Sequence, residues 1–139
     1  METSAVSADE FARKVKSLAQ HGRVLLLLDA CHSGAVGPGA SAADVSALRS
    51  AVDMDNVTVL TSASKTGELS QELPRWGHGA FTQAFLDALS GAADPSNHGV
   101  IAMSDLASAM DKDLDTLTKG QQHLGPRVNF FGDVFVVDR

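Results

Sequence analysis

The first clear pattern along the chain is an amphipathic helix that begins near Ser7. Ser7-Ala8-Asp9-Glu10 has the form of a capping box, in which the serine accepts from a free backbone amide and the glutamate reaches back. Apolar residues follow at i, i+4 and i+7 (Phe11, Val15 and Leu18), and Gly22 suits the end of a helix. The pattern predicts one helix with a single apolar face.

Two short apolar runs predict strands. Val24–Leu28 is unbroken, apolar on both faces and too short for a typical helix, which indicates a strand buried between helical layers. Val57–Thr61 is short and β-branched, and residues 134–137 predict a further strand near the end. Asp29 begins the turn after the first strand, where open α/β sheets place their chemistry.

Helical spacing returns in the second half of the chain. Phe81, Phe85 and Leu89 predict a helix that ends near Gly91. A turn over 94–99 and a brief extended piece over 100–103 follow. Ser104 is then expected to cap a third helix, whose apolar positions are Leu106, Met110, Leu114 and Leu117.

Two polar segments separate these elements, namely 35–56, rich in Gly, Ala, Ser and Asp, and 62–78, which contains Trp76. The order helix, strand, loop, strand, two helices, strand predicts a layered α/β fold with about three strands. A first strand that is this apolar needs a neighbour at the edge that does not face the second strand. We expect another chain or a swapped element to cover it.

Composition and charge narrow the function classes. The chain has 139 residues, of which 44% are hydrophobic and 20% charged, as in one globular unit. A net charge of −6 with scattered basic residues argues against nucleic acid and anionic membranes as partners, and mildly favours basic peptides. No signal peptide or membrane-length apolar run is visible, so we expect a cytoplasmic protein. A single cysteine excludes an internal disulfide.

That cysteine, Cys31, stands in Asp29-Ala30-Cys31-His32-Ser33-Gly34. Attack on a peptide carbonyl needs a nucleophile exposed at a strand end and backbone amides aimed at the developing oxyanion. Small neighbours let a substrate backbone approach, and Gly34 permits a sharp turn. The alternative is a packed structural thiol.

The hexapeptide resembles the active-site segment of metacaspases and orthocaspases in the caspase-like superfamily. Thr61-Ser62-Ala63-Ser64, then Gly77-His78-Gly79-Ala80-Phe81-Thr82, the segment 101–106 and the closing strand are similar to the small-subunit part of that family, in the same order. The resemblance covers most of 7–137. It implies a caspase-like three-layer α/β/α fold whose N-terminal strands lie outside 1–139. Residues 7–34 would form the nucleophile helix and strand, 35–56 the inter-subunit linker, and 57–139 the small-subunit part.

The resemblance also implies roles for individual residues. Cys31 would be the nucleophile, and its amide would form part of the oxyanion hole. Asp29 would line the pocket for a basic side chain, although it could instead merely cap the turn. Arg49, the only basic residue of the linker, is a possible autocleavage site, or an ordinary solvated residue. No cofactor is expected: calcium is used in the family, but Asp44, Asp53 and Asp55 match no calcium pattern.

The catalytic base is the missing part of this interpretation. The family places its histidine about fifty residues before the cysteine, but only thirty residues precede Cys31 here. His21 matches no motif, His78 is expected to lie at the surface or helix start, and His32 is expected to point away from the thiol. The base should therefore come from the N-terminal part of the same domain or from a swapped protomer.

Three functions compete at this point. The first is a cysteine endopeptidase that cleaves after Arg or Lys and is inactive as this chain alone. The second is a catalytically silent caspase-like interaction module, and the third is an unrelated α/β protein with an incidental cysteine. The presence of both Cys31 and Asp29 favours the first function over the second, and the order of the motifs disfavours the third.

Overall fold

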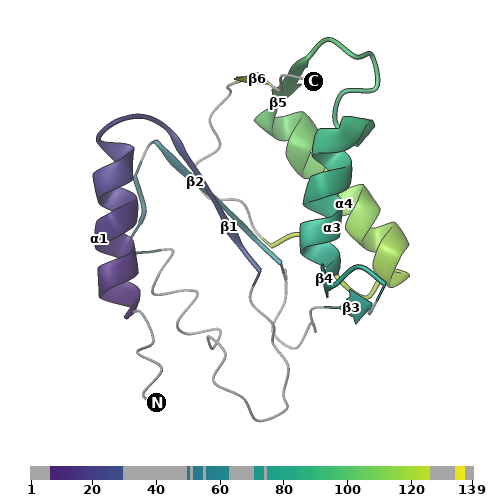
Figure 1. Cartoon of the computed structure of the whole chain (residues 1–139), viewed down its shortest axis with the longest axis horizontal. Coiled ribbons are helices and arrows are strands. Elements are labelled where there is room, and N and C mark those ends of the chain that lie inside the picture. Colours follow the sequence, from purple (N-terminus) through teal and green to yellow (C-terminus); the bar gives the residue numbers. More distant parts are fainter. Residues whose placement is uncertain are drawn as a thin grey trace.

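The fold has three layers with the parallel strands in the middle. The computed structural model describes residues 7–29, 50, 52–54, 56–62, 71–73, 75–125 and 134–136. Strands β1 (Val24–Leu28) and β2 (Val57–Thr61) lie between helix α1 (Ala8–Ala19) on one side and α3 (Ala80–Asp87) and α4 (Met103–Thr118) on the other (Figure 1). This is the α/β arrangement, with a small parallel sheet, that the sequence predicted.

Helix α1 begins at the predicted cap, where Ser7 Oγ accepts from the Glu10 amide at 3.2 Å. The Glu10 carboxylate lies 3.8 Å from Lys14 Nζ, one turn further on. The buried face consists of Ala12, Val15 and Ala19. The prediction that Leu18 belongs to this face is wrong, because Leu18 is 62% exposed. The face that meets the sheet is centred on small residues, about 90° away from Leu18 around the helix.

The bounds of β1 and β2 agree with the sequence prediction. The strands are parallel, in register from Val24 opposite Val57 to Leu28 opposite Thr61. Side chains of β1 alternate between the layers: Leu25 and Leu27 pack on the α3–α4 side, while Val24, Leu26 and Leu28 pack toward α1. Alternation between two apolar layers explains why the run is unbroken.

The second helical layer confirms the predicted helix end near Gly91 and departs from the prediction at the start of the next helix. Helix α3 continues into a π-helical turn, Ala88–Ala92, in which Gly91 has φ 143°. Helix α4 begins at Met103 directly after β5 (Val100–Ala102), so Ala102 is the N-cap and Ser104 lies inside the first turn. The prediction of a Ser104 cap is therefore wrong. Buried side chains from both helices form the larger core, among them Phe81, Leu106, Met110 and Leu114.

Two small antiparallel pairs complete the described fold. Strands β3 (Glu72–Leu73) and β4 (His78–Gly79) form a hairpin within the segment expected to be a loop. Strand β5 pairs with β6 (Val134–Val136), which confirms the closing strand. The described chain thus has six strands rather than about three, although β1 and β2 alone make the parallel sheet. Two-residue strands carry too little periodicity to be detected from sequence.

The last residues of the predicted linker are packed. Residues 35–49 of that segment lie outside the described residues. Val52 is fully buried in the core that α1 shares with β2. The Asn56 side-chain amide donates to the carbonyls of Ala19 and Gly22. These contacts tie the end of α1 to the start of β2.

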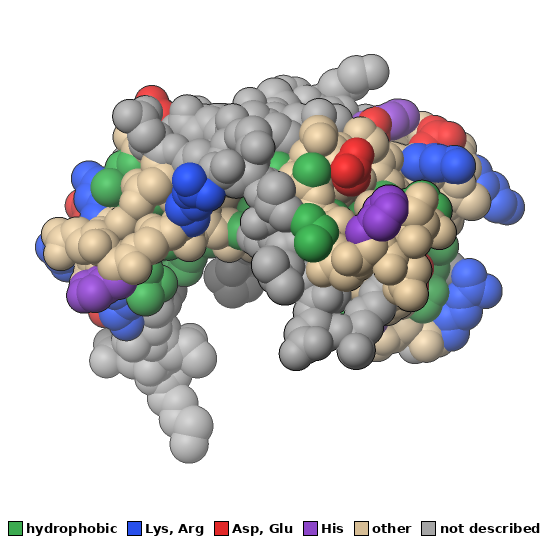
Figure 2. Space-filling view, turned by 90° about the horizontal axis from the view of Figure 1, so that it is seen from above, with side chains coloured by type: hydrophobic (Ala, Val, Ile, Leu, Met, Phe, Trp, Pro, Cys, Tyr) green, Lys and Arg blue, Asp and Glu red, His purple; other side chains and the backbone are tan. Residues whose placement is uncertain are grey.

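The described surface carries no concentrated charge on the face that Figure 2 shows. Lys and Arg side chains lie toward both ends of the molecule and are interspersed with acidic ones. Within the described ranges, no helix combines the length and the apolar character needed to cross a membrane.

Candidate active site at the carboxyl end of the sheet

Asp29 stands at the carboxyl end of β1, as the sequence predicted, and is exposed. The ends of β1 and β2 point toward the start of α3 and the β3–β4 hairpin (Figure 1). Cys31 follows two residues later but lies outside the described residues, as do His32 and Arg49. The geometry of the candidate site is therefore that of Asp29 and its surroundings.

The Asp29 carboxylate lies against the first turn of α3. Thr82 Oγ1 donates to Asp29 Oδ2 at 2.8 Å. A Cβ placed on Gly79 would lie 3.0 Å from the same oxygen and 3.6 Å from Oδ1. The two motifs of the family resemblance, which are separated by about fifty residues in sequence, therefore meet in space at this carboxylate.

The beginning of α3 suits a negatively charged neighbour. The first amides of a helix have no intrahelical partner, and the helix dipole is positive at this end. Gly79 occupies the N-cap position and provides no side-chain cap. Because Gly79 has no Cβ, the Asp29 carboxylate lies closer to the start of the helix than it could if position 79 carried a side chain.

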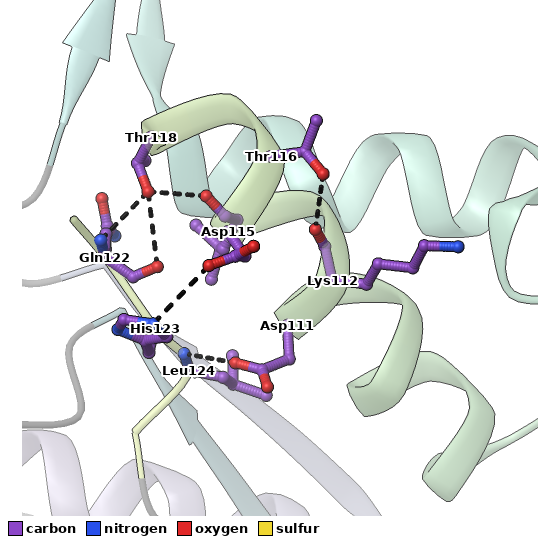
Figure 3. A network of polar contacts seen from close by, with 9 residues as sticks. Asp111, Lys112, Asp115, Thr116, Thr118, Gln122, His123 and Leu124 are labelled. Carbon is purple, nitrogen blue, oxygen red and sulfur yellow. Dashed lines mark hydrogen bonds and ion pairs between the residues drawn. The ribbon is translucent and has the colours of Figure 1, made fainter. Parts of the chain in front are cut away.

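A buried glutamine holds the segments around this point together. Gln122 is fully buried after the end of α4. Its Nε2 donates to the Ser62 carbonyl at 2.6 Å, and its Oε1 accepts from the Gln71 amide at 2.8 Å. Its own amide donates to Thr118 Oγ1 at 3.0 Å (Figure 3). The Gln71 carbonyl in turn accepts from the Ala80 amide, the first of α3, at 2.7 Å. Gln122 thus connects the end of β2 to the start of α3.

Sequence reasoning missed both Thr82 and Gln122 as parts of the site. In the sequence, Thr82 is only the last residue of a motif that opens a helix. Gln122 lies in a polar turn and gives no local signal, since its partners are about 50 and 60 residues earlier in the chain. Only the tertiary structure brings them together.

The described histidines lie in other surroundings. His78 is half-buried with Nδ1 3.1 Å from the Gly79 carbonyl oxygen. Gly79 faces Asp29, and successive side chains of a strand point to opposite faces, so His78 points away from the carboxylate. His21 follows α1 next to the amino end of β1, the opposite end from Asp29, with Nδ1 3.0 Å from the Ser17 carbonyl.

His123 and His98 complete the set. His123 Nε2 lies 3.8 Å from Asp115 of α4 (Figure 3). The segment that carries His123 borders β2 on the edge away from β1, where the Gly125 amide donates to the Thr61 carbonyl at 2.9 Å. His98 is exposed in the loop before β5, 3.7 Å from Asp94. Within the described chain, no histidine is placed as the base for a nucleophile that follows β1.

Metal binding finds no support in the described part of the chain. No group of three or more His, Cys, Asp or Glu residues there could hold an ion. Of the linker carboxylates considered above, Asp53 is exposed, while Asp44 and Asp55 lie outside the described residues.

Comparison with known proteins agrees with the motifs and the layers. The sequence pattern of the caspase domain matches residues 2–125. Comparisons with curated proteins and with solved structures gave no match. Since the matched region spans most of the 139 residues, the chain belongs to the caspase domain family of cysteine peptidases.

Proposed function

We propose that this chain carries the nucleophile and the specificity carboxylate of a cysteine endopeptidase of metacaspase or orthocaspase type, which cleaves after Arg or Lys. One observation carries the proposal: an exposed carboxylate, Asp29, stands at the carboxyl end of β1, two residues before Cys31. A carboxylate there reaches the side chain of the residue before the cleaved bond, and it pairs with a guanidinium or ammonium.

The chemistry follows from these positions. The Cys31 thiolate attacks the carbonyl carbon, and backbone amides, including that of Cys31, stabilise the oxyanion. The C–N bond then breaks, the amine leaves with a proton from the base, and water hydrolyses the thioester. Asp29 takes no part in proton transfer. It selects the substrate.

The base is assigned to a partner. We place it on the N-terminal part of the same catalytic domain or on a swapped protomer, which also covers the outer edge of β1. Without a base the thiol stays mostly protonated at neutral pH. The chain alone should then be nearly silent.

Turnover of fluorogenic peptides tests this function. The assembled enzyme should cleave after Arg and Lys. Asp29→Asn should lower kcat/KM for these peptides by at least about tenfold, since the basic side chain then lacks its charged partner. A preference for acidic residues would show that Asp29 was misassigned. Strong activity of this chain alone, abolished by His78→Ala or His32→Ala, would contradict the account of the base.

Self-processing provides a second test of basic specificity. Arg49 is the only basic residue in the linker 35–56, so an enzyme selective for basic residues should cut itself there or nowhere in that segment. Intact mass of the active protein, compared with Cys31→Ala, measures the cut. An uncut linker in an active enzyme would exclude autocleavage at Arg49.

A catalytically silent interaction module is the second candidate. The observation that favours it is that all five residues of β1, each apolar, are only half-buried, which suits contact with a partner. The two candidates differ in one result: an assembly with Cys31 intact that shows no turnover of any peptide would select the module.

A further inference from the structure

We propose that Thr82 is a positioning residue for specificity: its hydroxyl holds the Asp29 carboxylate in the orientation that accepts a basic side chain. The inference rests on the proposed function, because it assigns Asp29 to substrate recognition. It extends that function because it assigns part of the substrate selectivity to a residue of α3, some fifty residues after the nucleophile.

The hydroxyl of Thr82 contacts the Asp29 carboxylate directly. Thr82 Oγ1 donates to Asp29 Oδ2 at 2.8 Å, and a hydroxyl that donates to an ionised carboxylate makes a charge-assisted bond. Thr82 is the third residue of α3. A threonine in a helix divides between two main rotamers, and the bond to Asp29 selects one of them.

Gly79, at the N-cap of α3, is the second residue that lies against the Asp29 carboxylate. A Cβ at that position would lie 3.0 Å from Oδ2, which is tighter than most real Cβ contacts, so a larger residue shifts the carboxylate by a few tenths of an ångström. Gly79 and Thr82 flank the first turn of α3, and the carboxylate rests against both. Asp29 is thus held by the start of α3.

The helix start is itself fixed. Its first amide, on Ala80, donates to the Gln71 carbonyl, and the Gln71 amide donates to the buried side chain of Gln122. Asp29 therefore receives its orientation from a part of the molecule anchored in the core. This matters because an exposed ion pair loses most of its gain in ordering two flexible partners. A pre-oriented carboxylate avoids part of that loss.

The test measures charge selectivity in the intact protein. Product-like peptides ending in arginine or in its neutral isostere citrulline are titrated by fluorescence anisotropy, and the ratio of the two dissociation constants is compared between variants. Thr82→Val removes the hydroxyl and keeps the shape. It should reduce the preference for arginine about 3- to 10-fold, as expected for one lost hydrogen bond to a charged group.

Four further variants complete the test, three as controls and Gly79→Ala as a second probe of the carboxylate position. Thr82→Ser keeps the hydroxyl and should restore the ratio to within about twofold of wild type. Thr116→Val removes a hydroxyl that bonds a helix carbonyl on α4 and should leave the ratio unchanged. Gly79→Ala should lower the ratio as Thr82→Val does, whereas Gly22→Ala, where a Cβ meets nothing within 4 Å, should not.

The outcomes separate the inference from the function beneath it. If wild type binds both peptides equally, the proposed basic specificity fails. If wild type prefers arginine and both Thr82→Val and Gly79→Ala retain that preference, the positioning role is overturned while the function stands. Equal weakening of both peptides in Thr82→Val would also overturn it, because a merely structural role does not distinguish charge.

Discussion

Strands β1 and β2 are the same length, run parallel in register and lie between the same helical layers, yet their burial differs. Every residue of β2 is buried, whereas every residue of β1 is half-buried. The difference lies at the edges. Strand β2 has β1 on one side and the segment that contains Gly125 on the other. Strand β1 has a described neighbour on the β2 side alone.

The comparison shows that burial follows neighbours and not hydrophobicity. The half-buried strand contains only Val and Leu, while the buried strand includes two threonines, Thr58 and Thr61. A strand more apolar than its surroundings require is suited to a further neighbour. This is why we assign a partner to the outer edge of β1, the strand that leads into Asp29 and Cys31.

Matched truncations should give the largest difference. Leu60 and Leu27 are register partners that face the same α3–α4 core, but only Leu60 is fully buried. Leu60→Ala should lower the free energy of unfolding by about 3 kcal/mol, and Leu27→Ala by about half as much, because less surface is buried and a smaller cavity is left. Urea unfolding of the isolated chain measures both. Equal losses would mean that β1 is already covered.

Removing the anchor at the end of β2 should have the next largest effect. Gln122→Leu leaves the Ser62 carbonyl and the Gln71 amide without their partner, at a cost of about 2 kcal/mol. The neighbouring Gln121→Leu, at an exposed position, should cost less than about 0.5 kcal/mol. Urea unfolding of the two variants gives the difference. A similar cost for both would contradict the anchoring role of Gln122.

Hydrogen exchange should resolve the two edges of β1. The Val24 amide donates to the Asn56 carbonyl, so by alternation the amides of Leu25 and Leu27 point away from β2. In the isolated chain they should exchange at least about tenfold faster than the β2-facing amides of β1. Assembly with the partner, or high concentration if a second copy pairs there, should abolish the difference. Strong protection in the dilute isolated chain would remove the case for an open edge.

The elements that could be predicted from sequence are those with a continuous local pattern. The bounds of β1 and β2, the Ser7 cap and the place of Asp29 directly after a strand all follow from neighbours in the chain. The prediction that β1 is buried is wrong, because its residues are only half-buried. The β3–β4 hairpin was missed because its strands are two residues long. Leu18 was misplaced because three spaced apolar residues do not show that alanines face the sheet.

The parts of the candidate site contributed from other elements could not be predicted in the same way. Thr82 reaches Asp29 across 53 positions, and Gln122 reaches Ser62 across 60. Hydrogen bonds between such distant positions leave no periodic signal in a single sequence. The motif Gly77-His78-Gly79-Ala80-Phe81-Thr82 marked the right segment through its family resemblance, but Asp29 as the partner of its last residue emerged only from the fold.

The smallest expected effect concerns the helical layer that packs over one face of both strands. Burial, then a hydrogen bond to and repulsion from Asp87 of α3, raise the pKa of Asp113 of α4 above its ordinary value of 3.8. The folded chain therefore binds this proton more readily than the unfolded chain. The contribution of this pair to the stability of the folded chain rises as the pH falls from neutral through the raised pKa. At neutral pH the pair destabilises the folded chain.

Asp113→Asn should accordingly stabilise the chain at about pH 7, by about 1 kcal/mol or less, and should stabilise it less at about pH 4.5. Asp87→Asn should relieve the same repulsion and serves as the reciprocal control. Urea unfolding at both pH values gives the four comparisons. Equal destabilisation by Asp113→Asn at both pH values would show that the carboxylates of Asp113 and Asp87 do not repel each other. The packing of α3 and α4 over β1 and β2 would then not depend on pH through this pair.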